Sequence, residues 1–266
     1  MDANRKEELL DRLVDILEKE RGQRASDFVL TDDPWLQFRA LVNVRPAWPA
    51  SLEFLAAQDE LLQGLIAEAG VHGVDEAIPS PDDSRLCMWR GDITTLAADA
   101  IVNAANSQMQ GCWAPLHICI DNAIHTYAGV QLRAECARMM QAQGHDEPTG
   151  QAKVTAAYNL PARRIIHTVG PIANGFPTAR HRAELASCYH ACLDAAAAEG
   201  LQSTVFCCIS TGVFGFPQHE AARIAVRNVR DWLDSHDANM TVVFNVFTPK
   251  DEEIYRNALS LEDAPR

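Results

Sequence analysis

The sequence lacks the long apolar runs that membrane proteins need and the basic-then-apolar start of a secreted protein. Charged or amide residues interrupt its apolar runs well before the ~20 residues that cross a bilayer. The N-terminus, MDANRKEELLDRL, has no basic stretch followed by an apolar one. Internal repeats and low-complexity tracts are also absent. We therefore expect a soluble, cytoplasmic protein with no membrane partner.

Basic residues are scarce. The chain has 23 Lys and Arg against 36 Asp and Glu, which gives a formal net charge of −13. Affinity for nucleic acid rests mainly on cations that neutralise phosphates, so this charge disfavours a nucleic-acid partner. A small anionic ligand stays compatible with it, because backbone N–H groups hold phosphate without any basic side chain.

Eight cysteines in a 266-residue chain without a secretion signal predict free thiols or metal ligands rather than a disulfide framework. Cys112 and Cys119 flank His117 within eight residues and form a separate group. The other six lie in apolar strand-like or helix-like runs, and we expect them to be small core residues: Cys87, Cys136, Cys188, Cys192, Cys207 and Cys208.

The N-terminal part reads as all-helical. Apolar residues at helical spacing predict helices over 3–20, 34–44 and 52–69. Residues 1–80 would thus be a helical N-terminal extension, either a packing scaffold or a lid, joined through a Pro-rich and acidic linker over 73–84.

The chain then alternates between strands and helices, which predicts an α/β domain over 85–266 with a mixed, mostly parallel sheet covered on both faces. Ligands of such folds bind beyond the carboxyl ends of the strands. The predicted strands cover 85–90, 99–104, 152–158, 163–169, 204–209 and 241–247; one or two helices cover 120–142, and others 182–199, 219–234 and 249–259.

Three motifs fall at these strand ends, and each has an ordinary alternative. STGVFGFP at 210–217 has two glycines that let backbone N–H groups face a phosphate, or it is a simple turn, since it matches neither the Walker A nor the dinucleotide pattern. Asp92 would bind a ligand amine or cap the turn at Thr94. Asn103 and Asn106 would bind a ligand or stabilise a loop.

Taken together, the motifs resemble those of the macrodomain family, the ADP-ribose-binding fold, over about residues 85–260. The resemblance rests on GDIT at 91–94, DAIVNAANS at 99–107, TGQAKVTAAYNLPARRIIHTVGP at 149–171 and ISTGVFGFP at 209–217. The hydrolytic, MacroD-like branch is the most similar. The resemblance implies a macrodomain three-layer α/β/α sandwich, here with a helical N-terminal extension.

The resemblance also implies the ligand contacts. Asp92 would bind the adenine amine with the Ile93 backbone nearby. Asn106 would contact the distal ribose, with Asn103 also in the ligand set, and Phe214 would lie beside that ribose. The diphosphate would be wrapped by Ser210, Thr211, Gly212, Val213, Phe214, Gly215 and Phe216.

One loop departs from the common family pattern. After NAANS, a glycine-rich loop running into Val-Asp-Gly is usual, but here the chain reads GCWAPLHICIDN. Cys112, His117 and Cys119 offer two thiolates and an imidazole, which suit Zn²⁺, and three ligands leave one tetrahedral position open. This resembles the zinc-containing macrodomain subgroup. His125 is a rival ligand, although a packing role is favoured.

Asp121 corresponds to the aspartate of Val-Asp-Gly, and the resemblance implies that it and Asn106 are catalytic. Asp121 would act as base, orient a water or support His117. We expect a zinc-dependent protein-ADP-ribose hydrolase that cleaves mono-ADP-ribose from side chains at the distal ribose C1, with zinc activating water or holding a ribose hydroxyl. A non-catalytic ADP-ribose reader and an O-acetyl-ADP-ribose deacetylase are the alternatives.

The subgroup resemblance further implies a protein partner. Similar proteins are encoded beside a sirtuin-type ADP-ribosyltransferase and a lipoyl carrier protein of the glycine-cleavage H type. The lipoyl carrier would be the modified substrate.

Overall fold

A seven-stranded mixed sheet forms the centre of the protein in the computed structural model, which describes residues 1–22 and 31–261. Its strand order is β2-β3-β9-β8-β5-β7-β6. The two edge strands run antiparallel to their neighbours and the five inner strands are parallel. The strands are β2 (Ile78–Pro79), β3 (Leu86–Arg90), β5 (Ala100–Ala105), β6 (Ala152–Ala156), β7 (Arg164–Val169), β8 (Ser203–Phe206) and β9 (Thr241–Val246).

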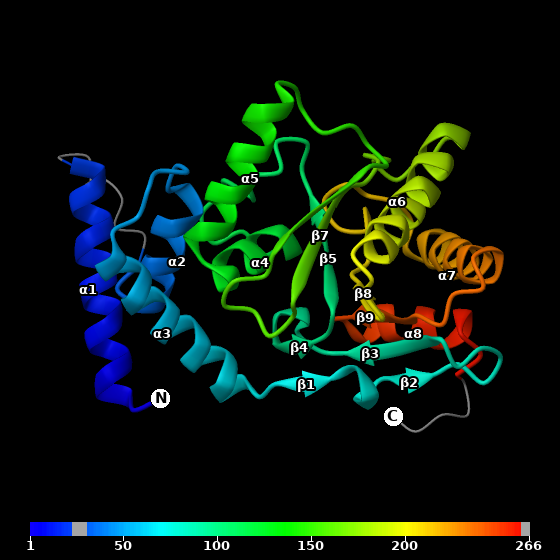
Figure 1. The fold of residues 1–266 in the computed structure, drawn as a ribbon, viewed down its shortest axis with the longest axis horizontal. Helices are drawn as coiled ribbons and strands as arrows, with labels where there is room; N and C mark the ends of the chain where they lie inside the picture. The colour runs from blue at the N-terminus through cyan, green and yellow to red at the C-terminus, as the bar shows by residue number, and fades with distance from the viewer. Residues whose placement is uncertain (23–30, 262–266) are drawn as a thin grey trace.

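Helices cover both faces of this sheet, so the predicted three-layer α/β/α fold is confirmed. Figure 1 shows α4 and α5 on one side of β5 and β7, and α6 and α7 on the other. Strands buried on both faces read as nearly continuous apolar runs, as β5 does with AIVNAA. The helices are α4 (Ile120–Ala128), α5 (Val130–Gln143), α6 (Ala179–Ala198), α7 (Gln218–Ser235) and α8 (Pro249–Ala258).

The segment 120–142, predicted as one or two helices, contains two. Gly129 ends α4 with φ 97°, a left-handed conformation that glycine adopts without a steric penalty. Helix α6 begins at Ala179, three residues before its predicted start, because the Thr178 side chain accepts a hydrogen bond from the His181 backbone N–H and caps it.

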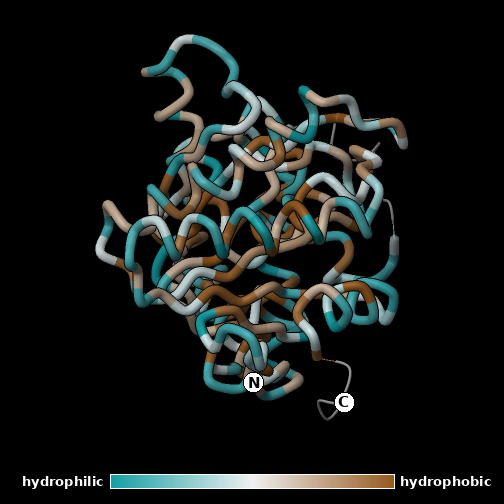
Figure 2. Tube along the Cα trace, turned by 90° about the vertical axis from the view of Figure 1, so that its right-hand side faces the viewer, coloured by the Kyte–Doolittle hydropathy of each residue, from teal (hydrophilic) through white to brown (hydrophobic). Residues whose placement is uncertain are grey.

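The hydrophobic core lies between the sheet and its helices. Figure 2 shows apolar strands running through the middle of the molecule, with polar turns of helix outside them. Aromatic rings join the layers here: the Phe206 ring centroid lies 5.0 Å from Tyr189 on α6, and the Phe244 centroid lies 5.3 Å from Tyr255 on α8. This packing fixes the ends of the inner strands, where the predicted site lies.

The three predicted N-terminal helices are confirmed as α1 (Ala3–Arg21), α2 (Pro34–Val44) and α3 (Leu52–Ala69). They pack beside α4 (Figure 1), where Trp35 of α2 contacts Tyr127 of α4 at 5.7 Å between ring centroids. They bury an apolar cluster of their own, made of Leu9, Leu10, Leu13, Leu17, Phe38, Leu41, Val42, Phe54, Ala57, Leu61 and Leu62. Helix α4 is therefore one of the elements that attach the extension to the sheet domain.

The predicted linker over 73–84 is more regular than expected. It contains the 3-10 helix η2 (Val74–Glu76) and the edge strand β2, in which Ile78 pairs with Met88. Just before it, β1 (His72–Gly73) pairs with β4 (Leu96–Ala97) in a separate small sheet. The boundary between extension and macrodomain stays a prediction, because strand pairing joins the two parts here.

None of the eight cysteines forms a disulfide, in agreement with the prediction of free thiols or metal ligands. Of the six expected in the core, five are buried and Cys208 is half-buried. Within residues 1–22 and 31–261, no helix combines the length and the apolar character that crossing a membrane requires.

Candidate functional site

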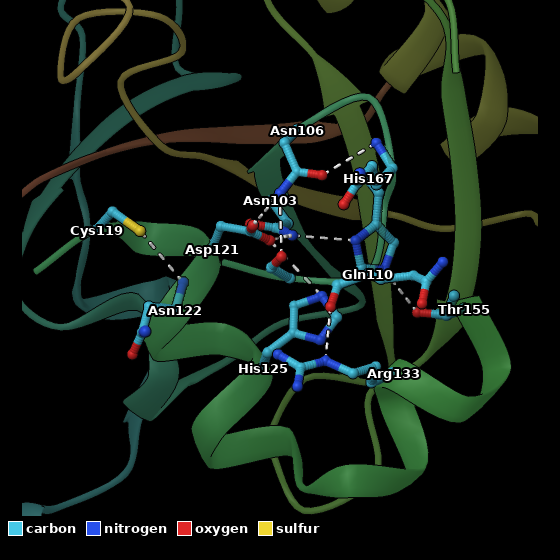
Figure 3. A network of polar contacts seen from close by, with 12 residues as sticks. Asn103, Asn106, Gln110, Cys119, Asp121, Asn122, His125, Arg133, Thr155 and His167 are labelled. Atoms are coloured by element: carbon cyan, nitrogen blue, oxygen red, sulfur yellow. Dashed lines mark hydrogen bonds and ion pairs between the residues drawn. The ribbon is translucent and has the colours of Figure 1, made fainter. Parts of the chain in front are cut away.

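The Asp121 carboxylate stands at the centre of the candidate site. It lies in the first turn of α4 and is buried, with 5% of its surface exposed. Asn103 Nδ2 donates to Asp121 Oδ1 at 2.8 Å, and Asn106 Nδ2 donates to Asp121 Oδ2 at 3.3 Å. Figure 3 shows these three side chains pointing toward one another. The structure thus brings both predicted catalytic residues together, with Asn103 beside them.

The environment of Asp121 suits proton transfer. Burial raises the pKa of its carboxyl group to about 6, while the hydrogen bond from Asn103 opposes the rise. A carboxylate with a pKa near neutrality is ionised in most molecules at pH 7 and accepts a proton more readily than an ordinary one. The raised pKa is compatible with the role as base predicted for Asp121, and that role stays a prediction.

The buried side chain of His167 forms a hydrogen bond with the Asn103 amide. His167 Nδ1 lies 3.1 Å from Asn103 Nδ2, and His167 Nε2 lies 2.9 Å from Thr155 Oγ1 (Figure 3). Burial lowers the pKa of His167 to about 3, so its ring is neutral. With Nδ1 accepting from the amide, Nε2 carries the proton and donates to Thr155. His167 is thus a core residue.

Asn103 and Asn106 differ in their access to a ligand. Asn103 is completely buried, so its side chain has no exposed surface with which to make the ligand contact predicted for it. Its role in the structure is to support Asp121. Asn106 is half-buried; its Nδ2 also donates to the Gly111 carbonyl at 3.0 Å, and its Oδ1 accepts from the Gln108 N–H at 3.0 Å. Asn106 therefore holds the loop after β5 in place, and part of its side chain remains exposed to solvent.

Cys112, His117 and Cys119 come together in the loop between β5 and α4. Their candidate ligand atoms lie within 4.8 Å of one another, and Cys112 Sγ is 3.4 Å from His117 Nδ1. Zinc–sulfur and zinc–nitrogen bonds are about 2.3 and 2.0 Å long, so these atoms fit around one tetrahedral ion with little movement. All three side chains are half-buried.

Cys119 also caps α4. Its Sγ accepts a hydrogen bond from the Asn122 backbone N–H at 3.4 Å (Figure 3), and the helix N-terminus favours a negative charge there. Burial nevertheless raises the pKa of the Cys119 thiol to about 12. The thiolate therefore needs a neighbouring cation at neutral pH, as a metal ligand does.

A second group, made of His125, Cys136 and His167, is buried in the core, and its ligand atoms also lie within 4.8 Å of one another. Both ring nitrogens of His167 already have partners in Asn103 and Thr155. Burial raises the pKa of Cys136 to about 12 and lowers that of His125. A neutral thiol and two neutral rings in the core agree with the packing roles predicted for Cys136 and His125.

The 210–216 loop presents free backbone donors at the end of β8. Gly215 N–H donates to the Gly212 carbonyl at 2.9 Å, and Phe216 N–H to the Ser210 carbonyl at 2.9 Å, which closes the turn. The N–H groups of Gly212, Val213 and Phe214 have no acceptor among the described residues. Unpaired N–H groups just before α7 suit a diphosphate.

Two residues of this loop, Ser210 and Phe216, are buried and stabilise the loop itself. Phe216 is 2% exposed, and its backbone N–H donates to the Ser210 carbonyl. Neither its side chain nor its N–H is therefore available for the ligand contact predicted for it. Ser210 is also buried and has φ 64°, which is strained for a residue other than glycine. The predicted ligand contacts of Thr211 and the three residues after it stay predictions.

At the other end of the predicted ligand site, Asp92 begins the 3-10 helix η3 (Ile93–Thr95). Its Oδ1 accepts hydrogen bonds from Thr94 N at 2.9 Å and Thr94 Oγ1 at 2.7 Å. The capping alternative is therefore observed. The carboxylate is exposed, so its contact with an adenine amine stays a prediction, and the Ile93 side chain is buried.

No sequence signal marks the residues that brace the 110–119 loop. Arg39 and Asn43 of α2 and Arg133 of α5 all donate to or accept from this loop. Each is separated from its partner by more than twenty positions in the chain, and none belongs to a recognised motif.

Comparisons with known proteins identify the family of this chain. The Macro domain family matches residues 102–225. A protein-ADP-ribose hydrolase of Treponema medium is 52% identical over 231 residues, covering 86% of this chain and 88% of the relative. One of Staphylococcus aureus is 47% identical over 255 residues, covering 94% and 95%. The Trypanosoma brucei macrodomain in complex with ADP-ribose superposes with a TM-score of 0.64 at 29% identity, covering 85% of this chain and 96% of that one. The chain belongs to the macro domain family.

Proposed function

We propose that this protein is a zinc-dependent protein-ADP-ribose hydrolase that removes mono-ADP-ribose from modified side chains by cleavage at the distal ribose C1. The observation that carries the proposal is the buried Asp121 carboxylate, held by Asn103 and Asn106 and two residues from Cys119. The names of the Treponema and Staphylococcus relatives support the hydrolase class.

Each part of the site then has a role. Cys112, His117 and Cys119 would hold Zn²⁺, which would supply Lewis-acid chemistry when bound. Asp121 accepts a proton from the attacking water, since its raised pKa suits a general base. Asn106 keeps the carboxylate aimed at the ribose. The free N–H groups of the 210–216 loop bind the diphosphate and fix the distance from phosphate to C1.

We also propose the substrate protein that the subgroup resemblance implies, a lipoyl carrier of the glycine-cleavage H type modified by a sirtuin-type transferase. Release of ADP-ribose from a modified lipoyl carrier, compared with release from an unrelated modified protein, tests this preference. Equal rates would remove it.

A cysteine substitution tests the catalytic use of the metal. Cys119→Ala should lower the zinc content and the rate of ADP-ribose release, while ADP-ribose itself still binds through the 210–216 loop. Cys87→Ser, in β3 and outside the site, is the matched control and should behave like wild type. If Cys119→Ala keeps full turnover, metal catalysis is wrong; if wild type binds ADP-ribose and never releases it from protein, the chain is a reader.

A further inference from the structure

Helix α2 of the N-terminal extension contacts the second half of the 110–119 loop directly. Arg39 Nη2 donates to the His117 carbonyl at 3.0 Å, and Arg39 Nε and Nη2 both donate to Asn122 Oδ1, at 3.2 and 3.0 Å. Asn43, four residues later on the same helix face, accepts from the Leu116 N–H at 3.1 Å and from Asn122 Nδ2 at 2.8 Å. Two side chains of α2 therefore hold the backbone on both sides of the Leu116–His117 peptide bond.

The first half of the loop is tied to the same helix through Arg133 of α5. Its Nε donates to the Gln110 carbonyl at 2.6 Å (Figure 3). Its Nη1 donates to the carbonyls of Val42 and Arg45 at the C-terminal end of α2, at 3.0 and 2.6 Å. The Val42 carbonyl also accepts a hydrogen bond from the Arg45 N–H at 3.3 Å, so Arg133 is its second donor. The Arg133 guanidinium also lies over the Trp113 ring, 4.2 Å from its centroid.

These contacts matter physically because the loop has little order of its own. It contains neither helix nor strand, and Leu116 has φ 57°, a conformation that residues other than glycine rarely adopt. Fixing a free loop costs conformational entropy each time it binds a metal. A loop that is already held by a packed helix has lost that freedom before the metal arrives, so it binds more tightly.

We propose that α2 is part of the metal centre, with Arg39 and Asn43 as positioning residues that hold Cys112, His117 and Cys119 in metal-binding geometry. This inference rests on the proposed function, in which that triad binds Zn²⁺. In this proposal the N-terminal extension holds the 110–119 loop of the macrodomain in the conformation that binds the metal. Arg39 is the better probe, because it is half-buried whereas Asn43 is 2% exposed.

The test measures Zn²⁺ affinity, by competition with a chromogenic chelator, in the full-length protein. Arg39→Met should weaken Zn²⁺ binding about 10- to 100-fold. Arg39→Lys keeps the charge but loses the two-pronged guanidinium group, so its Zn²⁺ affinity should lie between those of wild type and Arg39→Met. The matched control is Arg12→Met, which removes an exposed contact to Glu53 within the same extension and should bind Zn²⁺ like wild type.

Two further readouts separate positioning from general destabilisation. The melting temperature of metal-free Arg39→Met should stay near that of Arg12→Met, and amide hydrogen exchange should quicken over residues 112–119 in Arg39→Met alone. Wild-type Zn²⁺ affinity in both Arg39 variants would overturn the role of α2 and leave the metal site standing. A wild-type protein that binds no Zn²⁺ would instead overturn the metal site, and this inference with it.

Discussion

Asn103 Nδ2 lies 2.8 Å from Asp121 Oδ1, and this contact links strand β5 to the first turn of α4 in the core of the site. The same amide group reaches His167 Nδ1 at 3.1 Å. One asparagine therefore fixes the position of the carboxylate, and a neutral histidine fixes the asparagine. The catalytic role proposed for Asp121 depends on this arrangement, so changes to either partner should alter the reaction.

Replacing the carboxylate should stop the chemistry and spare binding. Asp121→Asn keeps the size of the side chain but removes the base, so ADP-ribose release from modified protein should fall at least about 100-fold. ADP-ribose affinity, measured by calorimetry, should stay within a few fold of wild type. Asp231→Asn, on α7 and exposed, is the control carboxylate. Equal loss of affinity and rate would mean that Asp121 serves binding instead.

The rate of hydrolysis should depend on pH through Asp121. The pKa of its carboxyl group is raised to about 6, and the base works only when ionised, so kcat/KM should fall as the pH drops through about 6. Asn103→Ala removes a hydrogen bond that favours the ionised form, and the fall should then begin at a higher pH. An unchanged pH profile in Asn103→Ala would show that another group controls it.

Buried His167 should make the protein less stable in mild acid. The pKa of His167 is about 3 in the folded state and about 6.5 in the unfolded chain. Between these values, His167 is protonated in the unfolded chain and neutral in the folded protein. The free energy of unfolding should therefore decrease as the pH falls, by up to about 1.4 kcal/mol per pH unit from this group. Urea unfolding at several pH values should give a shallower dependence in His167→Gln. Parallel curves would contradict the assignment.

The phosphate loop should tolerate a methyl group structurally but not functionally. A Cβ added at Gly212 meets nothing within 4 Å, so Gly212→Ala should melt like wild type. The methyl group would stand beside the free N–H groups, and ADP-ribose affinity should fall about tenfold, or 1.4 kcal/mol. Gly215→Ala is the contrast, because Gly215 has φ 65° and that variant should lose stability. Unchanged affinity in Gly212→Ala would place the diphosphate elsewhere.

The motif positions were predictable from the sequence because they depend on local order. The apolar run that forms β5 could be recognised directly, together with Asn103 inside it and Asn106 just after it. The Cys112, His117 and Cys119 group could also be recognised, because it lies within eight residues. The parallel sheet also followed, since its strands alternate with amphipathic helices. Each of these features needs only neighbouring residues to be recognised.

What escaped prediction depends on contacts between distant segments. The contact between Arg39 and the His117 carbonyl joins residues 78 positions apart, and nothing near Arg39 marks it as different from other helix arginines. The burial of Asn103 and of Phe216 likewise depends on which neighbours cover each strand end. The predicted linker over 73–84 became ordered because β3 was available as a pairing partner for Ile78.

Zinc bound to Cys112, His117 and Cys119 is the feature on which the proposed hydrolysis depends. It is tested by the metal content of the purified protein, from elemental analysis, together with ADP-ribose release from a mono-ADP-ribosylated protein before and after chelation. We expect about one zinc per chain, loss of release on chelation, and its return when Zn²⁺ is added back. Protein stripped of metal that still releases ADP-ribose at the original rate would contradict zinc-dependent hydrolysis.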